Sequence, residues 1–199
     1  EVTMDLFFQQ LLNGLTLGSL YALIAVGYTV VYGIVQIINF AYGEVFMIGA
    51  FGALATWTVL FQGQTGLWVL PVMIIGAVAA SVVVAVLMER VAYRPLRHAP
   101  RLAPLITAIG ISVFLQEAIR LFYPGAKSAM PFPRIDIVTG AALQLGPLTV
   151  RRSAIFTIGS LIVCAALLWY FINRTKLGRG MLAVSQDKDT ARLMGINVD

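Results

Sequence analysis

The sequence is poor in charged residues. Of its 199 residues, 12% are Asp, Glu, Lys or Arg, which is about half of the share found in soluble domains. Hydrophobic residues make up 59% of the chain, and the mean hydropathy is +0.87. This composition excludes an ordinary soluble globule. We therefore expect an all-α protein that crosses a membrane several times.

Cysteine and histidine are almost absent. Cys164 lies in an apolar run, so there is no disulfide framework, and we expect the thiol to pack as a small apolar group. His98 has no other metal-ligand residue types around it, so no metal site is predicted. The sequence also lacks a G-x-x-x-x-G-K-[ST] phosphate loop and any nucleophile–base pattern. We predict no cofactor and no enzymatic activity for this chain.

Long apolar runs take the place of the missing charge. A membrane span needs about 20 residues, and the first apolar stretch is longer than that, so we divide it into a short segment at 4–12 and a following span. Gly14 and Gly18 open that span, and Gly76 and Ala80 repeat the same spacing, which lets neighbouring helices approach closely. The predicted spans are 15–35, 43–61, 68–88, 102–123 and 154–172.

The basic residues indicate how the spans are oriented. The net charge is +5, and in a membrane protein such an excess indicates orientation rather than a nucleic-acid surface. Four arginines lie in the connection 89–101, and further basic residues lie in 175–199, two spans later. Both segments are therefore predicted to be cytoplasmic and the N-terminus external. The Pro- and Gly-bearing stretch 124–153 becomes an external, turn-rich loop, and a glycine-rich turn is predicted at 63–66.

Polar residues interrupt the apolar pattern where the first two spans meet. Asn39, Tyr42 and Glu44 lie in the segment INFAYGE. An ionisable group inside a membrane segment costs a few kcal/mol and indicates a functional site. Asn39 is a favoured N-cap type, so the next helix would direct its positive dipole end to this place, as transporters do to hold anionic substrate groups. Alternatively, Glu44 lies at the cytoplasmic boundary and complements the helix dipole.

A second polar group lies near the outer end of the fourth predicted span. Gln116, Glu117 and Arg120 are close in the sequence, and Glu117 and Arg120 are one helical turn apart. The spacing predicts an ion pair between them, which lowers the cost of holding both charges near the interface. A contact for an external partner is the alternative.

In the segment 175–199 charge returns in an amphipathic pattern. It predicts one or two short helices that lie at a membrane surface or against another protein. Gly178, Gly180 and Gly195 are expected to mark the helix ends. A solvated tail helix is the alternative. The apolar residues that recur at three- and four-residue steps are Leu177, Met181, Val184, Ala191, Leu193 and Met194.

Five segments together resemble one family. They are similar to the LivH-type permease subunits of bacterial ABC importers for branched-chain amino acids, and the resemblance covers nearly the whole chain except the external loop. Within the last segment, Asp189-Thr190-Ala191 followed by Gly195 resembles the EAA-x-x-x-G coupling loop, which sits in a cleft of the ATPase. Tyr42 stands where many members have His, and Asp189-Thr190 replaces Glu-Ala. The segments are QQLLNGLTLGSLYALIAVGYTVVYG, INFAYGEVFMIGAF, ERVAYRPLR, LITAIGISVFLQ and LGRGMLAVSQDKDTARLMGINVD.

The resemblance implies a membrane-spanning permease of the bacterial inner membrane that carries leucine, isoleucine or valine. It also implies a second permease subunit, two cytoplasmic ATPase subunits and an external solute-binding protein that meets the loop 124–153. Asn39, Tyr42 and Glu44 are then the expected substrate path. Members of the family continue with further spans, so residues 1–199 are expected to form one C-terminally incomplete permease domain. The expected ATPase-coupling residues are Arg179, Asp187, Asp189, Ala191, Arg192 and Gly195.

Two other functions remain open from the sequence. Related permeases carry urea or short amides, and a chain this apolar does not fix its substrate. An ion-coupled secondary transporter or a channel belongs to a different class and needs acidic residues deep within its spans. Most of the acids here lie at span ends or in loops, which weakens that reading.

Overall fold

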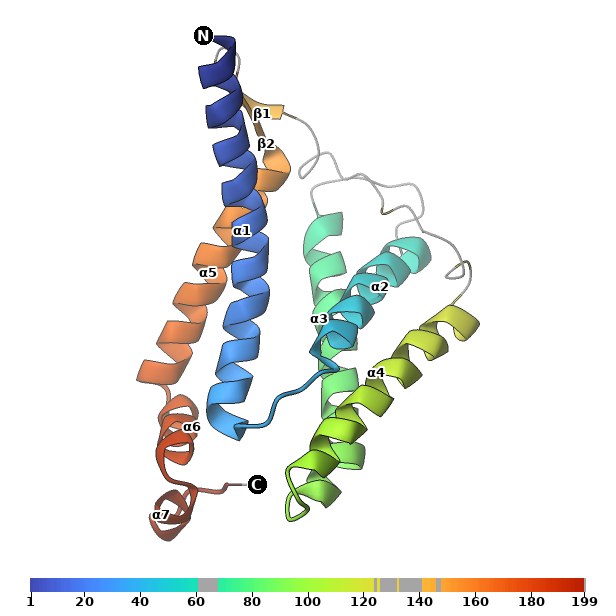
Figure 1. Ribbon diagram of the computed structural model, residues 1–199, viewed down its shortest axis with the longest axis vertical. Helices are drawn as coiled ribbons and strands as arrows, with labels where there is room; N and C mark the ends of the chain where they lie inside the picture. The colour runs from blue at the N-terminus through green and yellow to red at the C-terminus, as the bar shows by residue number, and fades with distance from the viewer. Residues whose placement is uncertain (61–67, 124, 126–131, 133–140, 146–147, 199) are drawn as a thin grey trace. The chain divides into compact units, whose positions relative to one another are not determined.

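The computed structural model describes residues 1–60, 68–123, 125, 132, 141–145 and 148–198, and Figure 1 shows them to be mainly helical. Within these described residues, five helices are long and apolar enough to cross a membrane. This confirms the predicted fold class and the predicted number of spans. The chain divides into two compact units, Glu1–Gln36 with Val138–Asp199, and Ile37–Ile137. The single permease domain over 1–199 stays a prediction.

The first unit is built on the helix pair α1 (Val2–Val35) and α5 (Arg152–Arg174), which pack along each other (Figure 1). Our division of the first apolar stretch is wrong, because α1 is one helix of 34 residues. No proline interrupts it, and across the expected break the Thr16 hydroxyl donates to the carbonyl oxygen of Leu12 at 3.0 Å. The helix ends at Gln36, which has a left-handed backbone with φ of 56°.

Two sequence expectations for this pair are not met. No described residue approaches within 4 Å of the place where a Cβ would stand on Gly14 or Gly18, so within the described structure this spacing brings no helix close. Cys164, on α5, is exposed and does not pack in an apolar interior. Apolar side chains such as Phe7 and Leu167 are also exposed, by 60% and 64%, as expected for helices whose outer faces contact lipid.

A β-hairpin precedes α5 in the same unit. The antiparallel strands are β1 (Ala141–Leu145) and β2 (Leu148–Arg151), with Gln144 opposite Thr149. They lie in the stretch 124–153, where we predicted a turn-rich loop and no strands, because prolines and glycines indicate turns. The prolines and glycines expected to shape this stretch, and the turn at 63–66, lie outside the described residues.

The second unit contains three candidate spans. They are α2 (Tyr42–Leu60), α3 (Val69–Met88) and α4 (Leu102–Phe122). These bounds agree with the predicted spans to within one residue at each described end. The connection after α3 is not a simple loop as expected: a π-helical turn, η1 (Glu89–Tyr93), and a 3₁₀ turn, η2 (Arg94–Leu96), continue the helix.

Small residues bring α2 and α3 into close contact. A Cβ on Gly76 would stand 2.0 Å from the Thr56 hydroxyl oxygen, and a Cβ on Gly52 would stand 2.7 Å from the Cβ of Ala80. The predicted close approach at Gly76 and Ala80 is therefore confirmed. Next to this contact lies the apolar core of the unit, which consists of Ala53, Val69 and Met73.

Candidate functional site

Asn39 fixes the turn that leads into α2. Its side-chain oxygen accepts hydrogen bonds from the backbone N–H of Ala41 at 2.9 Å and from the Tyr93 hydroxyl at 2.8 Å. The predicted N-cap role is wrong, because the carbonyl of Ala41 accepts from the N–H of Val45 at 3.2 Å, which places Ala41 at the N-cap position. Asn39 instead closes a turn onto the residue two positions ahead, a common alternative for Asn.

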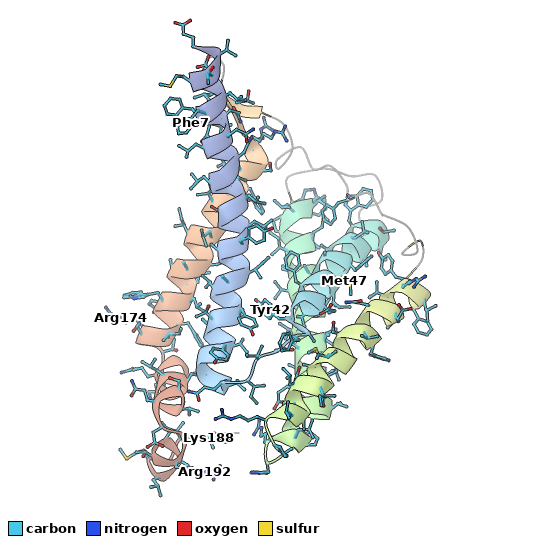
Figure 2. All side chains as sticks on the ribbon, viewed as in Figure 1. Phe7, Tyr42, Met47, Arg174, Lys188 and Arg192 are labelled. Atoms are coloured by element: carbon cyan, nitrogen blue, oxygen red, sulfur yellow. The ribbon has the colours of Figure 1, made fainter. Side chains whose placement is uncertain are left out.

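Glu44 accepts a hydrogen bond from α4, a helix that lies far away in the sequence. The Gln116 amide on α4 donates to a carboxylate oxygen of Glu44 at 2.6 Å and lies 3.5 Å from the Ser112 hydroxyl. Tyr42 lies at the start of α2 (Figure 2) and is half-buried. The structure thus joins Glu44 to a polar group on α4, while Glu117 and Arg120 form the predicted ion pair at 3.5 Å.

The register of α2 against α3 sets the level of Glu44. The Ser81 hydroxyl donates to the carbonyl oxygen of Val45 at 3.3 Å, and Ser81 lies near the middle of the continuous helical run Val69–Leu96. The charged turn that begins at Glu89 is predicted to be cytoplasmic, so the apolar part of the run ends at Met88, and at 1.5 Å per residue Glu44 is roughly 10 Å inside that end. A hydrocarbon core is about 30 Å thick, so this register favours a site within the membrane over one at the cytoplasmic boundary.

The segment after α5 forms two short helices in the first unit, α6 (Lys176–Gln186) and α7 (Lys188–Leu193). The prediction of one or two helices is confirmed. Thr175 joins α5 to α6: its hydroxyl donates to the carbonyl of Phe171 and accepts from the N–H of Gly178 at 3.0 Å. One side chain thus satisfies a carbonyl at the end of one helix and an N–H at the start of the next.

Gly178 and Gly180 lie inside α6, so the prediction that they mark helix ends is wrong. A Cβ on Gly178 would stand 2.1 Å from the carbonyl oxygen of Phe171, so α6 packs directly on the backbone of α5. The tight approach, rather than a helix stop, explains the glycine. At Gly180 the nearest atom to a Cβ would be a methyl carbon of Ile196 at 3.7 Å, which is an ordinary contact.

Asp187 separates α6 from α7. Its carboxylate accepts from the N–H groups of Asp189 at 3.1 Å and Thr190 at 3.2 Å, and from the Thr190 hydroxyl. The hydrogen bonds from Thr190, hydroxyl first, hold the pKa of Asp187 below its usual value. Figure 2 shows Lys188 and Arg192 on the short helix that follows. The predicted coupling residue Asp187 is therefore an N-cap, a role that the sequence did not reveal.

Gly195 ends α7, as predicted. It has φ of +83°, its N–H donates to the carbonyl of Arg192, and the N–H of Ile196 donates to that of Ala191, both at 3.1 Å. These two bonds form a Schellman motif, which needs a residue that tolerates the left-handed backbone. Of the other expected coupling residues, Ala191 is buried, whereas Arg179, Asp189 and Arg192 are exposed.

The predicted apolar face of this segment is only partly turned inward. Met181 and Val184 are half-buried, but Leu193 is 86% exposed and Met194 is 78% exposed. Leu177 is exposed as well. The predicted three- and four-residue spacing runs through the whole segment, whereas the structure interrupts the helix at Asp187, between α6 and α7. The tip of α7 therefore presents two apolar side chains.

Sequence reasoning missed several residues that position these sites. Tyr93, Ser81 and Thr175 were not considered, and Gln116 was placed only near an outer boundary. The hydrogen bonds of Ser81 with Val45, of Tyr93 with Asn39 and of Gln116 with Glu44 join residues from 36 to 72 positions apart. Spacing within one segment carries no signal for such pairs. The capping role of Thr175 could have been recognised, because Thr is a favoured N-cap directly before Lys176.

The chain matches the family model described as the permease component of branched-chain amino acid transport systems over residues 10–199. It is 43% identical over 197 residues to the high-affinity branched-chain amino acid transport system permease protein BraD of Pseudomonas aeruginosa, covering 96% of this chain and 63% of that protein. It is 40% and 39% identical to the LivH proteins of Salmonella typhimurium and Escherichia coli, with 97% of this chain and 63% of each of them covered. No solved structure matches. The chain belongs to the family of permease components of branched-chain amino acid transport systems.

Proposed function

We propose that the chain forms part of the membrane-spanning permease of an ATP-driven importer for branched-chain amino acids. The observation that carries this proposal is identity of about 40% to proteins named as such permeases along 96–97% of the chain. That similarity includes the start of α2 and the helices α6 and α7. The chain itself is not catalytic, and ATP hydrolysis belongs to partner subunits.

The substrate path passes the start of α2, at Asn39, Tyr42 and Glu44. The level of Glu44 near the middle of the α3 run supports this placement, as does its hydrogen bond to Gln116. An amino acid carries an ammonium group and a carboxylate. The Glu44 carboxylate can accept from the ammonium group, while the positive end of the α2 dipole favours the carboxylate.

The helices α6 and α7 couple the permease to its ATPases. The exposed Arg179, Asp189 and Arg192, with the apolar tip at Leu193 and Met194, form the contact. Asp187, Ala191 and Gly195 hold the shape of that contact through the cap, the buried side chain and the Schellman motif. ATP-driven closure of the ATPases displaces this segment and switches the spans between two arrangements.

The assembly contains a second permease subunit, two cytoplasmic ATPase subunits and an external solute-binding protein. The permease lies in the bacterial inner membrane with 175–199 cytoplasmic and the N-terminus external, in accord with the basic residues of 89–101 and 175–199. The binding protein docks on the stretch 124–153, which contains the β1–β2 hairpin.

ATP hydrolysis by the permease reconstituted with its partner subunits tests the proposal. Binding protein loaded with leucine, loaded with urea or empty is added, and stimulation by leucine alone is expected. In the variant Gly195→Trp this stimulation should be lost, because a bulky residue is strained at φ of +83°. Gly195→Asn is the matched control, since Asn tolerates that backbone conformation, and it should retain most of the stimulation.

The other outcomes are equally informative. Stimulation by urea instead of leucine keeps the importer and changes its substrate. Absence of any ATPase association contradicts the importer and favours an ion-coupled carrier. Equal activity of Gly195→Trp and Gly195→Asn removes the coupling role from the turn after α7.

A further inference from the structure

The side chain of Gln9 holds the β-hairpin against α1. Its amide nitrogen donates to the carbonyl oxygen of Thr149 at 3.3 Å, and its amide oxygen accepts from the N–H of Thr149 at 3.0 Å. Both backbone groups of one strand residue are thus satisfied by one side chain. A neighbouring strand makes the same pair of bonds to a strand edge. Gln9 therefore substitutes for a third strand beside β2.

A further hydrogen bond within α1 fixes the orientation of the Gln9 amide. Gln9 also donates to the side-chain oxygen of Asn13, one helical turn further along α1, at 3.2 Å. The residues around Gln9 on α1 are mostly apolar, and a polar side chain in such surroundings requires a partner. The Gln9–Thr149 pair is thus a specific attachment between residues 140 positions apart, and we call it the Gln9 clamp.

The contact beneath the Gln9 clamp is partly open, although α1 and β2 also touch each other directly. A cavity of about 400 Å³ lies between α1 and the junction of β2 with α5. Side chains therefore do not fill the space between the hairpin base and α1 here. Its lining includes Leu12, Thr16, Val150, Arg151, Ala154 and Ile158.

The clamped strand runs straight into a candidate span. β2 ends at Arg151 and α5 begins at Arg152, so no linker separates them. α5 has 23 residues, which at 1.5 Å each is enough to cross a hydrocarbon core of about 30 Å. The hairpin and α6 therefore lie at opposite ends of one span, and α1 contacts both β2 and α6.

We propose that Gln9 is a positioning residue for transport, because its clamp seats the hairpin so that a load on the hairpin moves α1 and α5 together. This inference rests on the proposed function, in which the solute-binding protein applies that load. Without the clamp, β2 can move while α1 stays in place, and docking is transmitted less completely to α6.

The test uses the reconstituted importer with the variants Gln9→Ala and Gln9→Glu. Gln9→Ala removes both bonds, and we expect the amide of Thr149 to exchange its hydrogen about tenfold faster. Stimulation of ATP hydrolysis by leucine-loaded binding protein should fall by a similar factor, while basal hydrolysis stays unchanged. Gln9→Glu keeps the acceptor but places a carboxylate against the Thr149 carbonyl, so its effect should lie between wild type and Gln9→Ala. Gln10→Ala, at an exposed neighbouring position, is the matched control.

Each alternative result overturns a defined part of the inference. Unchanged exchange at Thr149 in Gln9→Ala means that the clamp does not hold the strand. Faster exchange with unchanged stimulation means that the clamp is structural and does not act in coupling. A parallel loss of basal hydrolysis also assigns Gln9 to folding alone. If wild type itself is not stimulated, the proposed function fails, and the exchange measurement still decides whether the clamp exists.

Discussion

The two main helix pairs of this chain are packed in different ways. Between α2 and α3, a Cβ on Gly49, Gly52 or Gly76 would stand 2.0–2.7 Å from a partner side chain. Along α1 and α5, no described atom lies within 4 Å of a Cβ placed on Gly18 or Gly159, and the 400 Å³ cavity opens at one end. The first pair is in near backbone contact, which fixes its separation.

The difference in packing indicates which helix pair of the permease is held rigidly and which is held by fewer contacts. The α2–α3 pair carries the polar residues of the proposed path, and its close contact holds their register. The looser α1–α5 pair carries the hairpin at one end and α6 at the other. A pair that is held by the Gln9 clamp and by side chains, rather than by touching backbones, depends on those few contacts to move as one body when either end is loaded.

Replacing a glycine by alanine in each pair tests the comparison most directly. Gly76→Ala places a methyl group 2.0 Å from the Thr56 hydroxyl oxygen, so α2 and α3 must separate at a cost of about 1–3 kcal/mol. Gly18→Ala meets no described atom within 4 Å and should raise stability slightly, because alanine favours a helix. The midpoint of thermal unfolding in detergent measures both, and equal shifts for the two variants contradict the comparison.

The joint between α5 and α6 is the exception within the looser unit. Gly178→Ala would place a methyl group 2.1 Å from the carbonyl oxygen of Phe171, and a backbone atom cannot move aside easily. We expect leucine-stimulated ATP hydrolysis to fall as α6 is displaced, with a packing cost of about 1–3 kcal/mol confined to this joint. Gly180→Ala, where the nearest atom lies at 3.7 Å, is the control on the same helix and should behave like wild type.

A smaller effect on stability is expected for the hydrogen bond that attaches Asn39, in the segment between α1 and α2, to Tyr93 of η1. Tyr93→Phe removes the hydrogen bond to Asn39 and should lower the free energy of unfolding by about 0.5–1.5 kcal/mol. Denaturant unfolding in detergent measures it, and the exposed Tyr21→Phe serves as the control for loss of a hydroxyl. A change no larger than that of the control means that the link is held by the Asn39–Ala41 turn alone.

The smallest effect concerns the cap of α7. The pKa of Asp187 is below its ordinary value of 3.8, so the cap contributes stability above that pH and loses it as the pH falls through the lowered value. Hydrogen exchange at the amides of Asp189 and Thr190 should therefore reveal fraying of α7 below about pH 4. Asp187→Asn keeps an acceptor without a charge, and its protection, corrected for intrinsic exchange, should not depend on pH in this range. The same acid-dependent loss in both proteins contradicts the cap.

The sequence predicted features that depend on local composition. The bounds of α2, α3 and α4 follow from uninterrupted apolar runs, and Gly195 was recognised as a helix stop because glycine favours the left-handed backbone. The location of the polar group at the start of α2 was also predicted. By contrast, the continuity of α1 depended on the absence of a break around Asn13, which composition does not reveal.

The rest could not be predicted because it depends on tertiary contacts. The clamp joins Gln9 to Thr149, and the bond between Gln116 and Glu44 joins two different helices. Neither pair has a local spacing signature, since only the folded chain brings them together. The misassigned roles of Asn39 and Gly178 have the same origin, because each residue is of a type that serves both caps and close contacts.

Thr175 has a mechanical consequence for the whole first unit. A joint of one residue, bonded to the helix on each side, leaves no slack chain to absorb a displacement. A displacement of α6 is therefore transmitted almost completely to α5. Insertion of even one residue at this position would make the joint flexible. α6 could then rotate while α5 stays in place.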